Sequence, residues 1–170
     1  MKKKIYLFVL SLFVAGAGIM AFQQIPYRPH NYEPIMISRA DLESSFAFLP
    51  AQDIEQPGKI WVYNNYILLV EQYKGIHIID NSNPNSPQAI NFINILGCTE
   101  LAARDGIIYA NNAVDLIGIK LNESFSSLNI VSRNRNVLPI ISSPEPWDDW
   151  YYINKLPNDM IIIKWEPSNP

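Results

Sequence analysis

Aromatic and acidic side chains are interleaved in "EPWDDWYY", residues 145–152. Trp147 and Trp150 could stack on sugar rings, and the carboxylates of Asp148 and Asp149 could accept hydrogen bonds from hydroxyl groups. As a strand, the same stretch would pack alternate aromatics inward and turn its acids to water. Glycoside hydrolysis by one of these aspartates with Glu145 is a further alternative, although it needs a carboxyl separation that the sequence does not fix. These four aromatic and acidic residues form the candidate binding site for a glycan or protein.

The two histidines do not complete a catalytic arrangement. His77 lies in the run "GIHIID", where Ile76 and Ile78 occupy one face of a strand and His77 the other. We expect a hydrogen-bonded interior histidine, because no Ser, Cys or Asp completes a recognisable nucleophile site. His30, beside Pro29, is expected to be exposed and inert. The sequence therefore predicts a protein that is not an enzyme.

Oxygen-bearing side chains cluster directly after this run, at Asp80-Asn81-Ser82-Asn83. Ligands at alternate positions suit calcium, but the alternation ends at Pro84, and the glycine and distal glutamate of a calcium loop are missing. The favoured interpretation is a turn in which Asp80 accepts hydrogen bonds from nearby backbone N–H groups. Pro84 and Pro87 would stiffen this corner. No metal or cofactor is predicted.

The N-terminal residues have the layout of a secretory signal peptide. Lys2, Lys3 and Lys4 precede an apolar stretch, Ile5 to Ala17, which ends in small residues. Cleavage after Ala17 or Ala21 would deliver the chain to the periplasm or the cell surface. The alternative is an uncleaved membrane anchor, since the uncharged stretch from Ile5 to Phe22 just reaches the length that a bilayer needs.

Cysteine and charge narrow the class further. Cys98 is the only cysteine, so no internal disulfide can form, and its apolar neighbours predict a buried thiol. Loss of the three N-terminal lysines changes the formal charge from -3 to -6. An acidic chain without a basic run is a poor nucleic-acid binder.

From Lys59 the chain alternates short β-rich runs with turn signals. Asn64-Asn65 and Asp105-Gly106 favour tight hairpins, because these residues tolerate positive φ. The predicted strands are 59–63, 66–72, 75–80, 88–96, 99–103, 107–111, 114–121 and 128–132.

The predicted strands repeat along the chain. A shift of 41 residues superposes Ile60 on Leu101, Val62 on Ala103 and Ile67 on Ile108. Four short strands in a period of about 40 residues are typical of a propeller blade. Farther on, 150–153 and 160–165 are expected to form the inner hairpin of a third blade. The prediction is an all-β, partial propeller of about two and a half to three four-stranded blades.

The segment from Gly58 to Leu121 resembles the LVIVD-repeat, propeller-like exported proteins of Bacteroidetes. Their strand ending in Asp and the following "(N/S)-x-P-x-x-P" turn match Gly75 to Asp80, then Asn83, Pro84 and Pro87. The resemblance implies export and a repeat fold, while the biochemical role of that family is generally unassigned.

Three segments follow: a signal peptide (1–21), an irregular lead-in (22–57) and a repeat domain (58–170). A closed propeller needs at least about four blades, so three alternatives are open: a stack whose edges the lead-in and tail cover, a homo-oligomer joined through open sheet edges, or a shortened form of a longer propeller. The predicted function is a non-catalytic exported scaffold or binding module. Its alternative is a glycan-binding or glycan-processing protein that uses residues 145–152.

Overall fold

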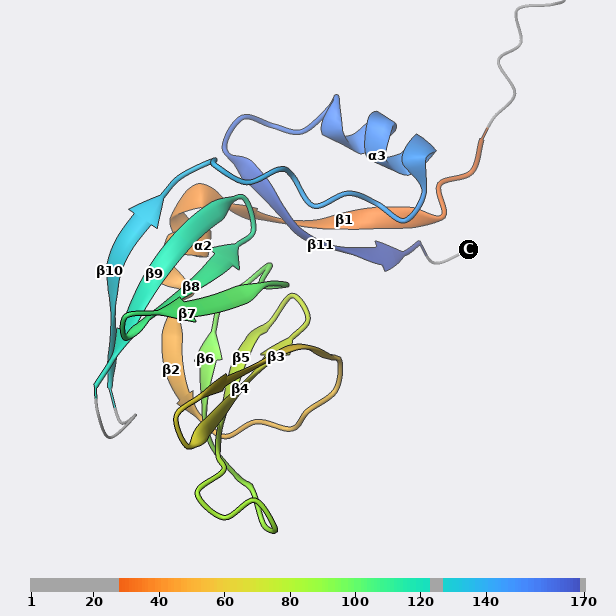
Figure 1. Cartoon of the computed structure of the whole chain (residues 1–170). Coiled ribbons are helices and arrows are strands. Elements are labelled where there is room, and N and C mark those ends of the chain that lie inside the picture. Colours follow the sequence, from red (N-terminus) through yellow and green to blue (C-terminus); the bar gives the residue numbers. More distant parts are fainter. Residues whose placement is uncertain (1–27, 123–126, 169–170) are drawn as a thin grey trace, which may run out of the picture.

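The computed structural model describes residues 28–122 and 127–168 (Figure 1). In this part of the chain, antiparallel strands dominate and form three sheets, none of them closed into a barrel. The described helices are too short to cross a membrane as an apolar span. The expected signal peptide lies outside the described residues and stays a prediction.

The first sheet has the strand order β2-β6-β5-β4-β3. Four of its strands are consecutive along the chain, and β2 adds to them at the β6 edge. The bounds are β2 Ala47–Pro50, β3 Pro57–Tyr63, β4 Tyr66–Glu71, β5 Gly75–Asp80 and β6 Gln88–Asn94.

The second sheet repeats this four-stranded arrangement in the order β10-β9-β8-β7. Its strands are β7 Leu101–Arg104, β8 Ile107–Asn112, β9 Asp115–Leu121 and β10 Leu128–Asn134. Adding 41 to the bounds of β4 gives the bounds of β8. The eight predicted strands from 59 to 132 are therefore confirmed, and two successive units share one fold.

The hairpins follow the turn chemistry of the sequence. The β3–β4 turn is Asn64-Asn65, and Asn64 has a φ of 52°. Asp105 and Gly106 occupy the equivalent turn between β7 and β8, with φ values of 53° and 77°. Both two-residue turns were predicted, and their left-handed residues suit the twist of paired strands.

The two sheets bury a common apolar core between them. Sheet 1 contributes Leu68, Val70, Ile76 and Ile78, which are fully buried. Ile117 and Ile119 of β9 pack against them from sheet 2. The contact therefore depends on β-branched and leucine side chains at alternate strand positions, which the predicted repeat already contained.

The described part of the lead-in, residues 28–57, contains regular secondary structure, so the expectation of an irregular segment is wrong there. It forms β1 Tyr32–Ser38, α2 Arg39–Ser44 and β2. The Ser38 hydroxyl caps α2 by accepting a hydrogen bond from the N–H of Asp41 at 3.1 Å. Strand β1 pairs with the distant β11, Met160–Pro167.

The expected inner hairpin of a third blade does not form. Residues 160–165 lie in a strand as predicted, but that strand pairs with β1. Residues 146–153 form the helix α3, Pro146–Ile153, where a strand was expected at 150–153. Pro146 at the first helical position, with Asp148 and Asp149 in the first turn, explains the difference, because both features stabilise a helix N-terminus.

Candidate functional site

The corner after β5 has a structural role. Asp80 Oδ1 accepts a hydrogen bond from the N–H of Ser82 at 2.8 Å, as the turn interpretation predicted. Asn83 Oδ1 accepts one from the N–H of Asn85 at 3.2 Å, and Pro84 and Pro87 lie exposed on the same corner.

Gly75 at the start of β5 has a structural reason to be glycine. Its φ is 154°, and a Cβ there would lie 2.0 Å from the carbonyl oxygen of Ile93. Such a contact is impossible without a shift of the backbone. Gly75 therefore permits the close approach of β6 to the start of β5.

His77 is an interior, hydrogen-bonded residue, as predicted, and its partner is Glu71. The two side chains are buried, with His77 Nε2 2.9 Å from Glu71 Oε2. The carboxylate also accepts the N–H groups of Glu55 and Gln56. Burial opposes ionisation of Glu71, but the hydrogen bonds from His77 and the two N–H groups outweigh it and lower the pKa of the carboxyl. The pair thus fastens the 55–56 segment to β4.

Cys98 is buried, as predicted. Burial raises the pKa of its thiol to about 12, so the nucleophilic thiolate is scarce near neutral pH. Its Sγ lies 3.8 Å from the carbonyl oxygen of Glu100. Cys98 acts as a small core residue.

Asp148 is the buried residue of α3. Only 1% of it is exposed, so the expectation that the acids of this stretch face water is wrong for Asp148. Asp148 Oδ1 accepts a hydrogen bond from His30 Nδ1 at 2.8 Å. Its Oδ2 accepts the N–H groups of Asn31 and Tyr32 at 3.0 and 2.9 Å. The Asp148 side chain thus holds the start of β1 against α3 through hydrogen bonds.

His30 therefore differs from its prediction as an exposed, inert residue. It is half-buried, and its ring lies 4.1 Å, between centroids, from that of Tyr151. Lys155 Nζ lies 3.5 Å from the centre of the Tyr151 ring. The contact of His30 with α3 could not be predicted from the sequence, because more than a hundred positions separate them.

The two tryptophans of α3 form an exposed aromatic platform. Their ring centroids are 5.1 Å apart and their planes differ by 21°, so the rings stack. Trp150 is 59% exposed, whereas Trp147 is half-buried and has Arg28 5.7 Å from its ring centre. We call these three residues, Arg28, Trp147 and Trp150, the α3 platform.

The remaining acids of the stretch lie at the helix start. Asp149 Oδ1 accepts a hydrogen bond from the N–H of Ser143 at 3.0 Å, and Glu145 is exposed. The structure thus brings Trp147 and Trp150 together on one surface. It directs Asp148 to the interior, against the lead-in.

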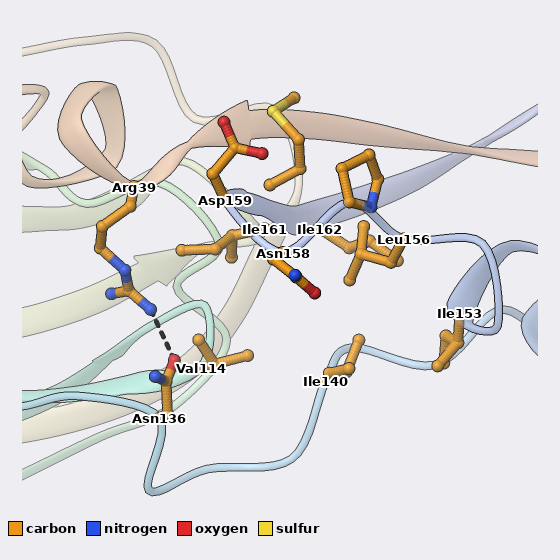
Figure 2. A pocket seen from close by; sticks show the side chains of 12 residues that line it. Arg39, Val114, Asn136, Ile140, Ile153, Leu156, Asn158, Asp159, Ile161 and Ile162 are labelled. Carbon is orange, nitrogen blue, oxygen red and sulfur yellow. Dashed lines mark hydrogen bonds between the residues drawn. The ribbon is translucent and has the colours of Figure 1, made fainter.

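A pocket of about 530 Å³ lies beyond the C-terminal end of α3. Figure 2 shows Arg39 and Asn136 at one end and Ile153 at the other. Ile140 and Ile161 line it between these ends together with Asn158 and Asp159, so its wall is mixed apolar and polar. The guanidinium of Arg39 is not free to bind an anion in this pocket, because it already donates hydrogen bonds to Asn136 and Asp115.

Asp115 is the centre of a charged cluster that the sequence did not reveal. It is fully buried and lies 2.6 Å from Arg39 Nη1 and 2.7 Å from Arg133 Nη1. Its Oδ1 accepts the N–H of Asn136 at 3.1 Å. Burial opposes ionisation, but hydrogen bonds from Arg39, Asn136 and Arg133 outweigh it and lower the pKa of Asp115.

Among the residues that the structure describes, the three buried acids share one property: each of them binds part of the lead-in. Glu71 binds residues 55 and 56, Asp115 binds Arg39, and Asp148 binds residues 30–32. A lone acid inside an apolar strand run, such as Glu71 in "YILLVEQ" or Asp115 in "VDLIGIKL", is the signal that could have identified two of these positions.

Among residues 28–122 and 127–168, no group of three or more His, Cys, Asp or Glu side chains is arranged to hold a metal ion. Comparisons of the chain with family models, with curated proteins and with solved structures found no match.

Proposed function

We propose that the protein is an exported, non-catalytic binding module that holds a glycan on the α3 platform. The supporting observation is the 59% exposed ring of Trp150, which stacks on Trp147. Two stacked indoles offer a flat apolar surface to solvent, and such a surface suits the apolar face of a sugar ring.

The anchoring of α3 favours binding over catalysis. Asp148 accepts three hydrogen bonds and is withdrawn from solvent, so it is poorly placed to exchange a proton with a substrate. The same bonds fix the helix against β1, which lowers the entropy lost when a ligand binds the platform. A protein ligand on the same surface is the alternative partner, and glycan processing by Asp149 with Glu145 is the alternative activity.

The proposal includes a propeller-like relation of the two repeat sheets, of the LVIVD type. Its support is the 41-residue shift from β4 to β8 and the ion pair of Lys59 in β3 with Glu100, the residue before β7, at 2.6 Å. Export through the N-terminal segment belongs to the same proposal.

Titration calorimetry against a panel of soluble glycans tests the function. We expect at least one glycan to bind, and Trp150→Ala to weaken binding about tenfold, which corresponds to about 1.4 kcal/mol of lost stacking. Val137→Ala is the matched control, because Val137 is also exposed but lies on the loop after β10, outside α3.

Two results would overturn the proposal. One is a panel without binding, and the other is equal affinity of the wild type and Trp150→Ala. Turnover of a glycan that is lost in Asp149→Asn would move the protein into the enzyme class instead.

A further inference from the structure

Most basic side chains in the described part of the chain form ion pairs. Those that do are Arg39, Lys59, Lys74, Arg104, Arg133, Arg135 and Lys164. Among residues 28–122 and 127–168, the lysines and arginines without a carboxylate partner are Arg28, Lys120 and Lys155. Arg28 and Lys155 are exposed, and both lie against aromatic rings of α3. Unpaired cations are therefore concentrated at this helix.

The two cations lie beside neighbouring rings of the helix. Arg28 is 5.7 Å from the centre of the Trp147 ring, and Lys155 Nζ is 3.5 Å from the centre of the Tyr151 ring. Trp147 and Tyr151 are four positions apart, so they are neighbours on one side of α3, about 6 Å apart along its axis. Arg28 and Lys155 thus accompany the side of α3 that carries the platform.

The acids of α3 do not neutralise these cations. Asp148 is buried and accepts its hydrogen bonds from residues 30–32. Asp149 accepts the N–H of Ser143 and lies two positions from Trp147, a spacing at which helical side chains do not face each other. Glu145 precedes the first helical residue and forms no ion pair with Arg28 or Lys155 among the residues described. The charges of both cations are therefore left for another partner.

We propose that the glycan on the α3 platform is acidic, with a carboxylate or sulfate group bound by Arg28 and Lys155. The planar guanidinium of Arg28 has paired N–H donors that match two oxygens of such a group, and Lys155 adds a point charge. The sugar ring itself stacks on the exposed Trp150. The inference rests on the proposed function, because it names the class of glycan that the same site binds.

The ring contacts hold the cations in place without using their hydrogen-bond donors. The face of an aromatic ring attracts a cation through its quadrupole, whereas the N–H groups of that cation still need acceptors. An acidic sugar supplies acceptors and negative charge beside the apolar ring face that stacks on an indole. A neutral sugar would cover the indole and leave both positive charges without a counter-charge.

Titration calorimetry with two matched pairs of oligosaccharides tests the inference. The first pair is a galacturonate oligomer and its methyl ester, and the second is a sulfated galactose oligomer and its unsulfated form. We expect at least one acidic oligomer to bind about tenfold more tightly than its neutral counterpart, because two exposed ion pairs form. The pair that shows the preference identifies the acidic group. The preference should shrink as the salt concentration rises, since salt screens exposed charges.

Variants of the two cations link the preference to this site. In Arg28→Gln with Lys155→Gln, the affinity for the acidic oligomer should fall about tenfold, while the affinity for the neutral one changes less than about twofold. Lys120→Gln is the control, because Lys120 is also exposed and unpaired but lies in β9. It should keep the full preference for the acidic oligomer.

Equal affinity for acidic and neutral oligomers would overturn the inference and leave the proposed function intact, as would a preference that the double variant retains. Failure of every glycan to bind would overturn both. Binding to vesicles of phosphatidylglycerol but not of phosphatidylcholine, without binding of any oligomer, would also overturn both and would assign the cations to an anionic membrane surface.

Discussion

Sheet 1 and sheet 2 share the order of their four consecutive strands, yet they differ at the second hairpin. In sheet 1, Gln72, Tyr73 and Lys74 join β4 to β5, whereas two residues join β8 to β9. Gly75 opens β5 and Asp115 opens β9, so a glycine and a buried acid hold the same position. The glycine admits the neighbouring backbone of β6, while the acid gathers Arg39, Arg133 and Asn136.

The difference shows where a repeated sheet can change without losing its fold. Apolar positions between the sheets are kept in both units, since they form one core. The buried acids lie where non-repeated segments meet a sheet, at Glu71 in the first unit and Asp115 in the second. Repeat units diverge at the points where each must hold a different part of the lead-in.

The largest effect is expected for Asp115→Asn. It removes the only negative charge that is fully buried between Arg39 and Arg133, and we expect a loss of about 3–5 kcal/mol in the free energy of unfolding. Urea denaturation measures this loss. Asp105→Asn, at an exposed turn, should change stability by less than about 0.5 kcal/mol. Equal losses of stability in both variants would contradict a special role of the buried charge cluster at Asp115.

A smaller loss is expected for Gly75→Ala in sheet 1. The added Cβ would meet the carbonyl oxygen of Ile93, so β6 must move, at a cost of about 2–3 kcal/mol. Gly106→Ala is the control. It has a φ of 77°, but its added Cβ meets nothing closer than 3.7 Å, so only backbone strain remains, at about 1 kcal/mol. A control that loses as much stability as Gly75→Ala would show that strain, and not the approach of β6, decides the effect.

Acid should weaken the attachment of the lead-in in both units, with the smallest effect of the three. The pKa of Glu71 is lowered in the fold, so its contribution to stability is complete above its ordinary value of 4.5 and is lost as pH falls through the folded value. The urea concentration at the unfolding midpoint should therefore decrease when the pH is lowered below about 4. The Glu71→Gln variant should lose less stability than the wild type when the pH is lowered over that range. An equal pH dependence of the two proteins would contradict the role of the Glu71 carboxylate.

Much of the repeat region could be predicted from the sequence. Residues such as Asn64 and Asp105 specify tight turns locally, and alternation around His77 identified an interior strand. These predictions succeeded because a hairpin is decided by neighbours along the chain.

The termini could not be predicted in the same way. Residues 150–153 have the aromatic content of a strand, but Pro146 and the first-turn acids begin a helix, and the interior role of Asp148 depends on residues 30–32. The pairing of β1 with β11 also depends on contacts across the whole chain, which no local pattern encodes. The glycan proposal therefore depends on the stacked rings of Trp147 and Trp150, and no longer on the carboxylates of Asp148 and Asp149.

The union of β1 with β11 has a consequence for the order of folding. His30 and Asp148 are 118 positions apart, so the first described strand cannot reach its place until α3 and the last strand exist. At roughly 5–20 residues per second, synthesis of that interval takes about 6–24 s. During this time sheet 1 and sheet 2 can form from local hairpins, but β1 has no partner. Completion of the fold is therefore delayed until β11 has left the ribosome.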